Sequence, residues 1–435
     1  MVGVTQFKMR IRSAFKRIIN NDYVFTILTK VFAVAIGLVA SSFSNRFLGA
    51  ELKGQLGSIS SLLSVIAVSA NFGLYQPYPY YKRQKEPYAL ERFLNIFSFQ
   101  FIVYLIIGLA CATQTQSLKI TAVCLLAPIQ VLANQLSFII MVEDVKFKNV
   151  IFFIARIANT LITIIAFYTM KRTILVSLSL IVIGDVITIF MVLARLKCRP
   201  NPFKTDFSFL IRIIPFGIVS MITTLMLTLN YRIDTLMMDY MFHIPDREIG
   251  FYTLGVSLSE YGWLIPDAFR EVLFSRTARS DAIDDVIMSL KINFYLTLCM
   301  IAGIVLVGKL MIRILAGIEF LPSYSVTVFL IIGILPMSWF KIVGTLLLAQ
   351  GKKYIYLLML SISVLVNIVC NIIAIPIWGK LGAAAASVAS YTAAGIMFLG
   401  YFLHRNSIPL RQAFLFNTNE IYLLQQRLGR LRKRF

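Results

Sequence analysis

Five basic side chains lie inside long apolar stretches of this sequence: Lys30, Arg156, Arg212, Arg270 and Lys341. A charge at the depth of a lipid bilayer costs between about 2.5 and 17 kcal/mol, so an ionisable residue there is by default a candidate for a ligand site or a transport pathway. Because the excess is cationic, the pattern favours an anionic ligand. Lysine and arginine together can hold a pyrophosphate group by charge-assisted hydrogen bonds.

Acidic and amide side chains also lie in or at the ends of the apolar stretches, and they indicate a second role. Asp185 and Glu260 lie within apolar stretches, and Asp234 lies at the end of one. Buried carboxylates can carry protons or sodium ions during transport, or can neutralise neighbouring cations. Asn367 and Asn371 are four residues apart and therefore share one face of a helix, which we expect to line the protein interior or an aqueous cavity.

Each of these residues also has a purely structural interpretation. Lys30 and Arg212 lie near the ends of their apolar stretches, from which long basic side chains can reach the lipid headgroups. Stripes of small and polar residues can pack helices against one another, and a carboxylate can serve only to pair with a cation. The sequence leaves both interpretations open.

The composition identifies the class of protein that must position these residues. Hydrophobic residues make up 58% of the 435 residues, charged residues only 14%, and the mean hydropathy is +0.80. A soluble fold of this length would have too little polar surface. We predict an all-α polytopic membrane protein with about 12 transmembrane helices in two six-helix bundles, because continuously apolar helices satisfy their own backbone in lipid. The predicted spans are 23–47, 57–80, 92–112, 118–141, 149–170, 173–195, 209–231, 249–275, 288–312, 322–350, 354–377 and 381–403.

The basic residues of the connections predict the orientation and the domains. Lysine and arginine gather at the N-terminus, in alternate connections and in the C-terminal tail, which the positive-inside rule places in the cytoplasm. Both termini are therefore expected inside, and the five intramembrane cations fall in the cytoplasmic half of their spans. The expected parts are a basic N-terminus (1–22), an N-terminal bundle (23–196), a cytoplasmic linker (197–208), a C-terminal bundle (209–403) and a basic tail (404–435).

Several functional classes are disfavoured by the sequence. The formal net charge of +22 is spread over short connections, which argues against nucleic-acid binding. The only two histidines, His243 and His404, lie far apart, and the cysteines lack metal-ligand spacing, so we expect no metal site and no cofactor. The sequence has no phosphate-binding loop of the ATPase type, and we expect no enzymatic activity.

The C-terminal third resembles a known family. The AQGKK turn (Ala349 to Lys353), the pair Asn367 and Asn371, and Pro376 near the end of that span resemble polysaccharide flippases of the Wzx type, in the multidrug/oligosaccharidyl-lipid/polysaccharide exporter superfamily. Further matching positions are Leu48, Gly49, Gly54, Gly73, Asp234, Gly250, Tyr252, Pro266, Gly379, Gly382, Ala383 and Ala384.

The resemblance implies a function. Such flippases use alternating access to move undecaprenyl-diphosphate-linked oligosaccharide repeat units, for O-antigen or related surface polysaccharide, between the leaflets of a bacterial inner membrane. It also implies membrane lipids, a polysaccharide polymerase and a chain-length regulator as partners. Two alternatives remain: an organic-cation or multidrug antiporter of the same superfamily, and a non-transporting scaffold of a polysaccharide assembly complex.

Overall fold

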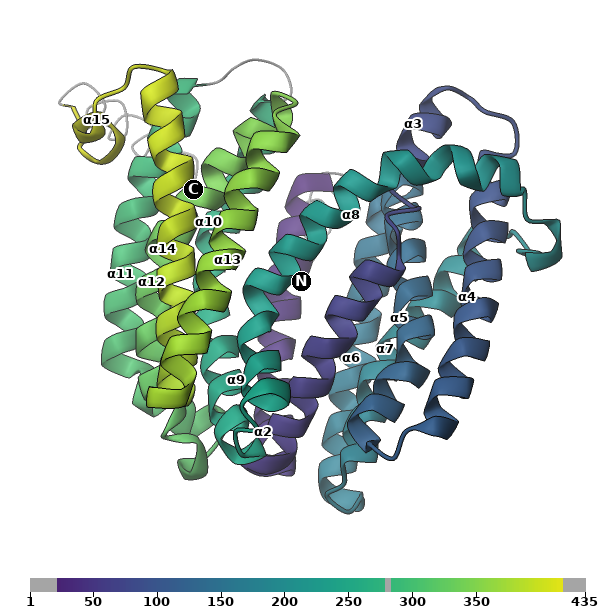
Figure 1. Ribbon diagram of the computed structural model, residues 1–435, viewed down its shortest axis with the longest axis horizontal. Coiled ribbons are helices and arrows are strands. Elements are labelled where there is room, and N and C mark those ends of the chain that lie inside the picture. Colours follow the sequence, from purple (N-terminus) through teal and green to yellow (C-terminus); the bar gives the residue numbers. More distant parts are fainter. Residues whose placement is uncertain (1–21, 278–282, 418–435) are drawn as a thin grey trace, which may run out of the picture. The chain divides into compact units, whose positions relative to one another are not determined.

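The structure is a computed structural model that describes residues 22–277 and 283–417. Within these ranges every regular element is helical, and the chain forms two compact units (Figure 1). Unit 1 contains the chain up to Thr228, together with Pro245–Gly250 and Ile312–Glu319. Unit 2 contains Leu229–Ile244, Phe251–Met311 and the chain from Phe320. Most of the two predicted basic ends, and the side chain of the candidate Lys30, lie outside the described residues.

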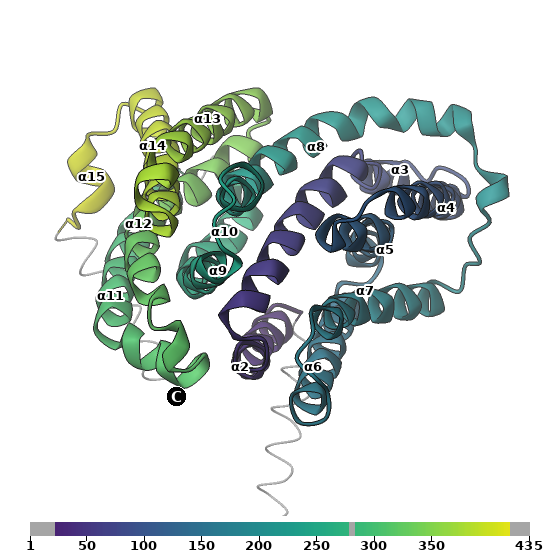
Figure 2. The same ribbon diagram turned by 60° about the horizontal axis from the view of Figure 1, so that its bottom comes forward.

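Unit 1 is built from long helices that pack side by side (Figure 2). Helix α2 contacts α5, α6 and α7, while α4 packs on α5 and the short α3 packs on α4. The bounds are α2 (Asp22–Ala70), α3 (Tyr78–Arg83), α4 (Ala89–Gln114), α5 (Leu118–Glu143), α6 (Val145–Thr169) and α7 (Ile174–Leu196).

Helix α8 (Phe207–Leu236) belongs to both units. Near its start, Phe209 is buried against the rings of Tyr81 and Phe93, with centroids 5.0 and 5.4 Å away. This aromatic contact joins the first part of α8 to unit 1, and the division between the two units falls within α8, after Thr228. The cytoplasmic linker at 197–208 stays a prediction.

Unit 2 contains the later helical segments apart from Pro245–Gly250 and Ile312–Glu319, which belong to unit 1. In it α14 packs closely on α12 and α13, and α10 packs on α12. The elements from the end of α8 onward are the π-helical turn η2 (Met237–Met241), α9 (Asp246–Glu260), η3 (Tyr261–Trp263), α10 (Leu264–Thr277), α11 (Ile283–Leu315), η4 (Ile318–Phe320), α12 (Ser323–Ala349), α13 (Lys353–Trp378), α14 (Lys380–Arg405) and α15 (Leu410–Phe414).

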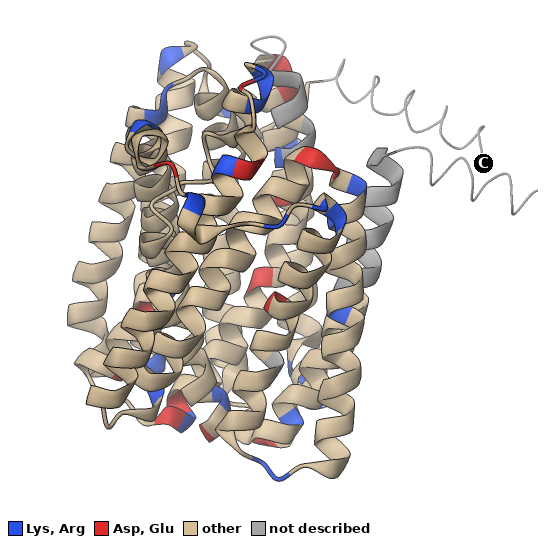
Figure 3. Cartoon of the chain, turned by 90° about the vertical axis from the view of Figure 1, so that its right-hand side faces the viewer, with Lys and Arg blue, Asp and Glu red and all other residues tan. Residues whose placement is uncertain are grey.

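The helices have the length and composition of membrane spans. Ten helices in the described part of the chain are long and apolar enough to cross a bilayer. Helix α2 is broken at Gly49, and the segment α9–η3–α10 coincides with the predicted span 249–275. Taking α2 as two limbs and α9–η3–α10 as one broken span gives the twelve predicted spans. Most charged residues lie toward the helix ends, and a few lie within the spans (Figure 3).

Local chemistry explains where the helices bend and begin. Gly49 has φ of 68° and ψ of 179°, a conformation that side-chain-bearing residues rarely adopt, and it separates the two limbs of α2. Asp144 begins α6 by accepting a hydrogen bond from the backbone N–H of Phe147 at 3.0 Å. Asp206 begins α8 in the same way, with the N–H of Phe209 at 3.0 Å. Both aspartates satisfy backbone donors that the first helical turn leaves free.

The close packing of α14 depends on small residues. A Cβ atom on Gly395 would lie 2.2 Å from the carbonyl oxygen of Pro336 in α12, which is far inside van der Waals contact. Ala383 and Ala384 on α14 are fully buried. Small side chains let membrane helices approach closely, and this approach replaces the hydrophobic driving force that is absent in lipid.

Candidate functional site

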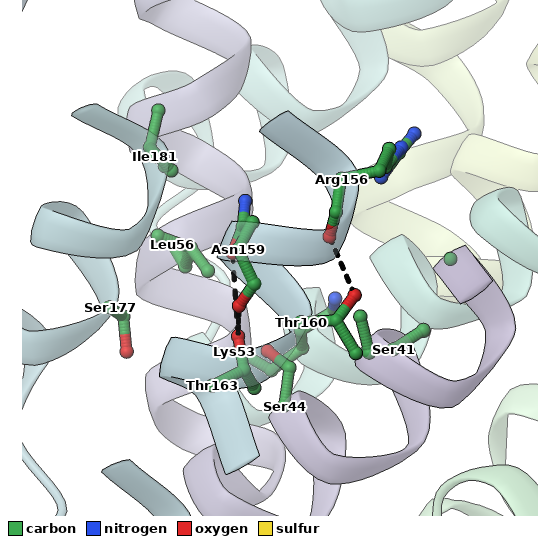
Figure 4. Close-up of a pocket in the computed structure, with 12 residues that line it drawn as sticks. Ser41, Ser44, Lys53, Leu56, Arg156, Asn159, Thr160, Thr163, Ser177 and Ile181 are labelled. Carbon is green, nitrogen blue, oxygen red and sulfur yellow. Dashed lines mark hydrogen bonds between the residues drawn. The ribbon is translucent and has the colours of Figure 1, made fainter. Parts of the chain in front are cut away.

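Unit 1 contains a polar cavity of about 210 Å³ between α2, α6 and α7 (Figure 4). Helix α2 contributes residues from both of its limbs, so the break at Gly49 shapes the cavity. The lining residues are Gly37, Ala40, Ser41, Ser44, Lys53, Leu56, Arg156, Asn159, Thr160, Thr163, Ser177 and Ile181.

Two cations line this cavity. Lys53 lies one turn beyond the break in α2, and Arg156 lies near the middle of α6. Among the residues that the structure describes, no carboxylate forms an ion pair with either side chain. The Arg156 guanidinium lies 5.6 Å from the centre of the Phe152 ring, and it would contact a Cβ atom at Gly37 at 3.8 Å, so the guanidinium lies directly beside the first limb of α2. Both positive charges are therefore available to a ligand.

The remaining polar groups of the cavity are hydroxyls and an amide. Thr160 donates to the carbonyl oxygen of Arg156 and Thr163 to that of Asn159, both at 2.8 Å, so each hydroxyl uses its proton within α6. The buried Ser177 hydroxyl has no hydrogen-bond partner within the described ranges. Two cations and an unpaired hydroxyl in one membrane cavity suit an oxygen-rich anion such as phosphate.

Lys53 was not among the residues predicted from the sequence. The predicted spans end at 47 and resume at 57, which makes Lys53 an ordinary lysine of a connection. The structure instead continues α2 through this region after the break at Gly49, so Lys53 lies on a helix that packs against α6 and α7. The sequence signal that could have identified Lys53 is its helical spacing relative to the polar residues that follow it in the second limb of α2.

Unit 2 brings three predicted residues into one charged cluster. The Lys341 Nζ lies 3.0 Å from the Asp267 Oδ1, and the Arg270 Nε lies 3.7 Å from the same oxygen. The predicted coupling residue Glu260 lies 3.6 Å from the Arg232 guanidinium. Asp267 and Arg232 were not predicted as site residues, because only the fold brings them to Lys341 and Glu260.

A second group in unit 2 surrounds Asp234, which is fully buried. Its carboxylate accepts hydrogen bonds from Tyr252 Oη at 2.9 Å, Asn371 Nδ2 at 2.6 Å and Ser387 Oγ at 2.5 Å. The predicted Asn367 is part of the same network, since its Oδ1 accepts from Asn371. In the part of the chain that the structure describes, no basic side chain pairs with Asp234. Such a carboxylate, ringed by amide and hydroxyl groups, can exchange a proton or hold a small cation.

Two other predicted residues stand apart from these groups. Arg212 is exposed on α8, and Asp185 is partly buried on α7. Within the described ranges neither side chain forms an ion pair. Arg212 thus fits the alternative of reaching toward lipid headgroups, while Asp185 lies two turns beyond the cavity residue Ser177.

The fold is that of known transporters and flippases. The sequence matches no family model and no curated protein. Among solved structures, an inward-facing multidrug resistance MATE family transporter of the MOP superfamily is similar, with a TM-score of 0.69, 13% identity, and coverage of 86% of this chain and 94% of that one. The predicted all-α fold with about 12 helices in two bundles is confirmed.

The lipid II flippase MurJ, in its inward closed conformation, is similar to the same degree. Its TM-score is 0.68 at 14% identity, with coverage of 90% of this chain and 89% of that one. An outward-facing MATE transporter gives a TM-score of 0.59 at 13% identity, over 88% of this chain and 95% of that one. At these identities the likeness establishes the fold, and the choice of cargo depends on the residues of the chain.

Proposed function

We propose that this protein is a flippase that moves undecaprenyl-diphosphate-linked oligosaccharide repeat units from the cytoplasmic to the outer leaflet by alternating access. The observation that carries this proposal is the cavity of unit 1, where Lys53 and Arg156 have no carboxylate partner among the described residues. Unpaired cations inside a membrane are costly unless a ligand uses them. A diphosphate supplies the missing negative charge.

The chemistry of the two side chains supports a diphosphate cargo. The planar guanidinium of Arg156 can hold two phosphate oxygens at once, and the ammonium of Lys53 acts as a compact point charge. The oligosaccharide of such a cargo is polar and needs a hydrophilic path, whereas its polyprenyl tail can stay in lipid. The similarity in fold to MurJ, which is a lipid II flippase, supports a cargo that has a polar head and a lipid tail.

We assign the other candidate residues either to cargo contact or to ion coupling. Lys341 and Arg270 form a second cationic site in unit 2, and Lys30 and Arg212 stay candidates for contact with cargo or headgroups. Asp234, with Asn367 and Asn371 beside it, is the proposed site of ion coupling. Asp185 and Glu260 are further coupling candidates, with Glu260 already paired to Arg232.

Location and partners follow from the same proposal. The protein would act in a bacterial inner membrane with both termini in the cytoplasm, beside a polysaccharide polymerase and a chain-length regulator. The basic connections of the sequence support this orientation. We propose no nucleic-acid partner and no cofactor.

A second candidate function is an organic-cation or multidrug antiporter. It is supported by the likeness to MATE transporters and by Asp234 and Asp185, two carboxylates that pair with no described cation. Against it, the cavity of unit 1 is lined by two basic and no acidic side chains. A cation cargo would be repelled there. A non-transporting scaffold is a third candidate, and an open polar cavity argues against it.

The test is a deletion strain of the source organism. Surface polysaccharide is examined on a gel, and the leaflet location of its lipid-linked repeat units is measured in parallel. Loss of long polysaccharide with repeat units trapped on the cytoplasmic face, restored by the wild-type gene, supports the flippase. Unchanged polysaccharide together with new sensitivity to cationic dyes overturns it in favour of the antiporter.

A further inference from the structure

Lys341 is held in place from two directions. Its side chain is only 6% exposed, and its ammonium lies 3.0 Å from Asp267 Oδ1 and 4.3 Å from the centre of the Trp263 ring. Burying an unpaired ammonium costs several kcal/mol or more. The carboxylate and the ring together offset that cost. They also fix the position of the Lys341 ammonium while no other anion is bound.

Asp267 is a weak and accessible partner for these cations. Its side chain is 37% exposed, and a single oxygen, Oδ1, faces both Lys341 and Arg270. Within the described ranges its Oδ2 makes no hydrogen bond or ion pair. One carboxylate therefore serves two cations through one oxygen, and the trio keeps a net charge of +1.

We propose that Asp267 is a built-in counter-anion, which occupies Lys341 and Arg270 until the diphosphate of the cargo displaces it. This inference rests on the proposed function and adds a residue that sets its affinity. A diphosphate has more charge and more oxygens than a carboxylate, so it can engage both cations more fully. Arg270 lies three residues from Asp267 on α10, so the two side chains are neighbours on one face of that helix.

The counter-anion limits how tightly the cargo is held. Each bound diphosphate must first break the pairs to Asp267, which weakens binding, and the returning carboxylate helps to release the cargo. Removing the negative charge from Asp267 should therefore strengthen binding of a diphosphate and slow its release. A purely structural role predicts the opposite, since the loss of the pair would leave Lys341 poorly placed.

The experiment uses the purified full-length protein and farnesyl diphosphate as probe, with farnesol as the uncharged comparison. Asp267→Asn is expected to raise affinity for farnesyl diphosphate about twofold to fivefold, in line with the loss of one competing ion pair. Asp267→Glu keeps the charge and should keep an affinity near that of the wild type. Asp144→Asn, which breaks the pair with Arg195 at the start of α6, is the matched control and should bind like the wild type.

The double variant Asp267→Asn with Lys341→Gln decides whether the effect runs through the lysine. It should lose the gained affinity. The inference is overturned if folded Asp267→Asn binds farnesyl diphosphate no more tightly than the wild type, or if the gain persists without Lys341. Failure of the wild type to bind farnesyl diphosphate better than farnesol instead contradicts the proposed diphosphate cargo, and the inference falls with it.

Discussion

Asn371 donates a hydrogen bond of 2.6 Å to the buried carboxylate of Asp234, which lies 137 residues earlier in the chain. The contact joins α13 to the end of α8 inside unit 2. Tyr252 and Ser387 donate to the same carboxylate, so three neutral donors satisfy it in place of a cation. A carboxylate with this surrounding can bind and release a proton or a small cation without breaking an ion pair.

Replacing Asp234 by asparagine should uncouple transport from the ion gradient. The amide has neither the negative charge nor the titratable group of the carboxylate, so transport into proteoliposomes should lose its dependence on a sodium or pH gradient. Tyr252→Phe is the matched control, since it removes one donor at a cost of about 1 kcal/mol in stability and leaves the carboxylate. Gradient dependence that survives in Asp234→Asn would exclude this residue from coupling.

Neutralising the two cations of the unit 1 cavity should weaken binding of a prenyl diphosphate. Hydrogen bonds to charged groups contribute about 1.5–3 kcal/mol, so Lys53→Gln and Arg156→Gln should each lower affinity by about tenfold to a hundredfold. Binding to purified protein measures this. Arg195→Gln, which removes a cation that pairs with Asp144 outside the cavity, should leave affinity unchanged. Full affinity in both cavity variants would rule out the cavity as the anion site.

Acid should destabilise the protein in part through Asp144, which lies between α5 and α6. The hydrogen bond from the Phe147 N–H, followed by that from Arg195, lowers the pKa of this carboxyl below its ordinary value of 3.8. A lowered folded-state pKa means that the stabilisation is complete above that ordinary value. It is lost as the pH falls through the folded-state pKa.

Thermal unfolding between pH 6 and pH 3 checks this sign. The unfolding temperature of the wild type should fall over the lower part of the range, and Asp144→Asn should show a smaller fall. Arg195→Gln should give an intermediate result, because the Phe147 N–H still holds the carboxylate. An equal fall in the wild type and in Asp144→Asn would contradict the assignment.

The contact between α12 and α14 should tolerate no side chain at Gly395. An added methyl group would lie 2.2 Å from the Pro336 carbonyl oxygen, so the backbones must move apart, and overpacking of this kind costs about 1–3 kcal/mol. Gly395→Ala should lower the unfolding temperature in detergent. Gly400→Ala on the same helix meets no atom within 4 Å and should be at least as stable as the wild type.

The helical fold could be predicted because the signal for each span is local. Twenty apolar residues in a row identify a membrane helix without knowledge of its neighbours, and the predicted spans correspond to the observed helices. The break at Gly49 was harder to place, because α2 continues as a helix on both sides of it. Lys53 was missed because the sequence predicts a connection between residues 47 and 57, where the structure has the second limb of α2.

The pairing of charges could not be predicted from the sequence. Lys341 and Arg270 were predicted as candidate diphosphate-binding residues without a named partner, and the fold brings Asp267 to both, across 74 residues in the case of Lys341. Arg156 was predicted on the same reasoning and does line a cavity. The sequence shows that a charged residue lies within an apolar stretch. Its ion-pair partner depends on which helices pack together, and the sequence alone does not show this.

Trp263 is an intrinsic fluorescent probe of the charged cluster in unit 2. Its ring contacts the Lys341 ammonium at 4.3 Å and the Tyr231 ring at 4.6 Å. The sequence has only two other tryptophans, Trp339 and Trp378, so replacing both by phenylalanine leaves a single indole emitter. Because indole emission responds to nearby charge, a change in the ion pairing of Lys341 would shift the emission wavelength of Trp263. Binding of an anion to Lys341 could then be followed in real time in the purified, reconstituted protein, without an added label.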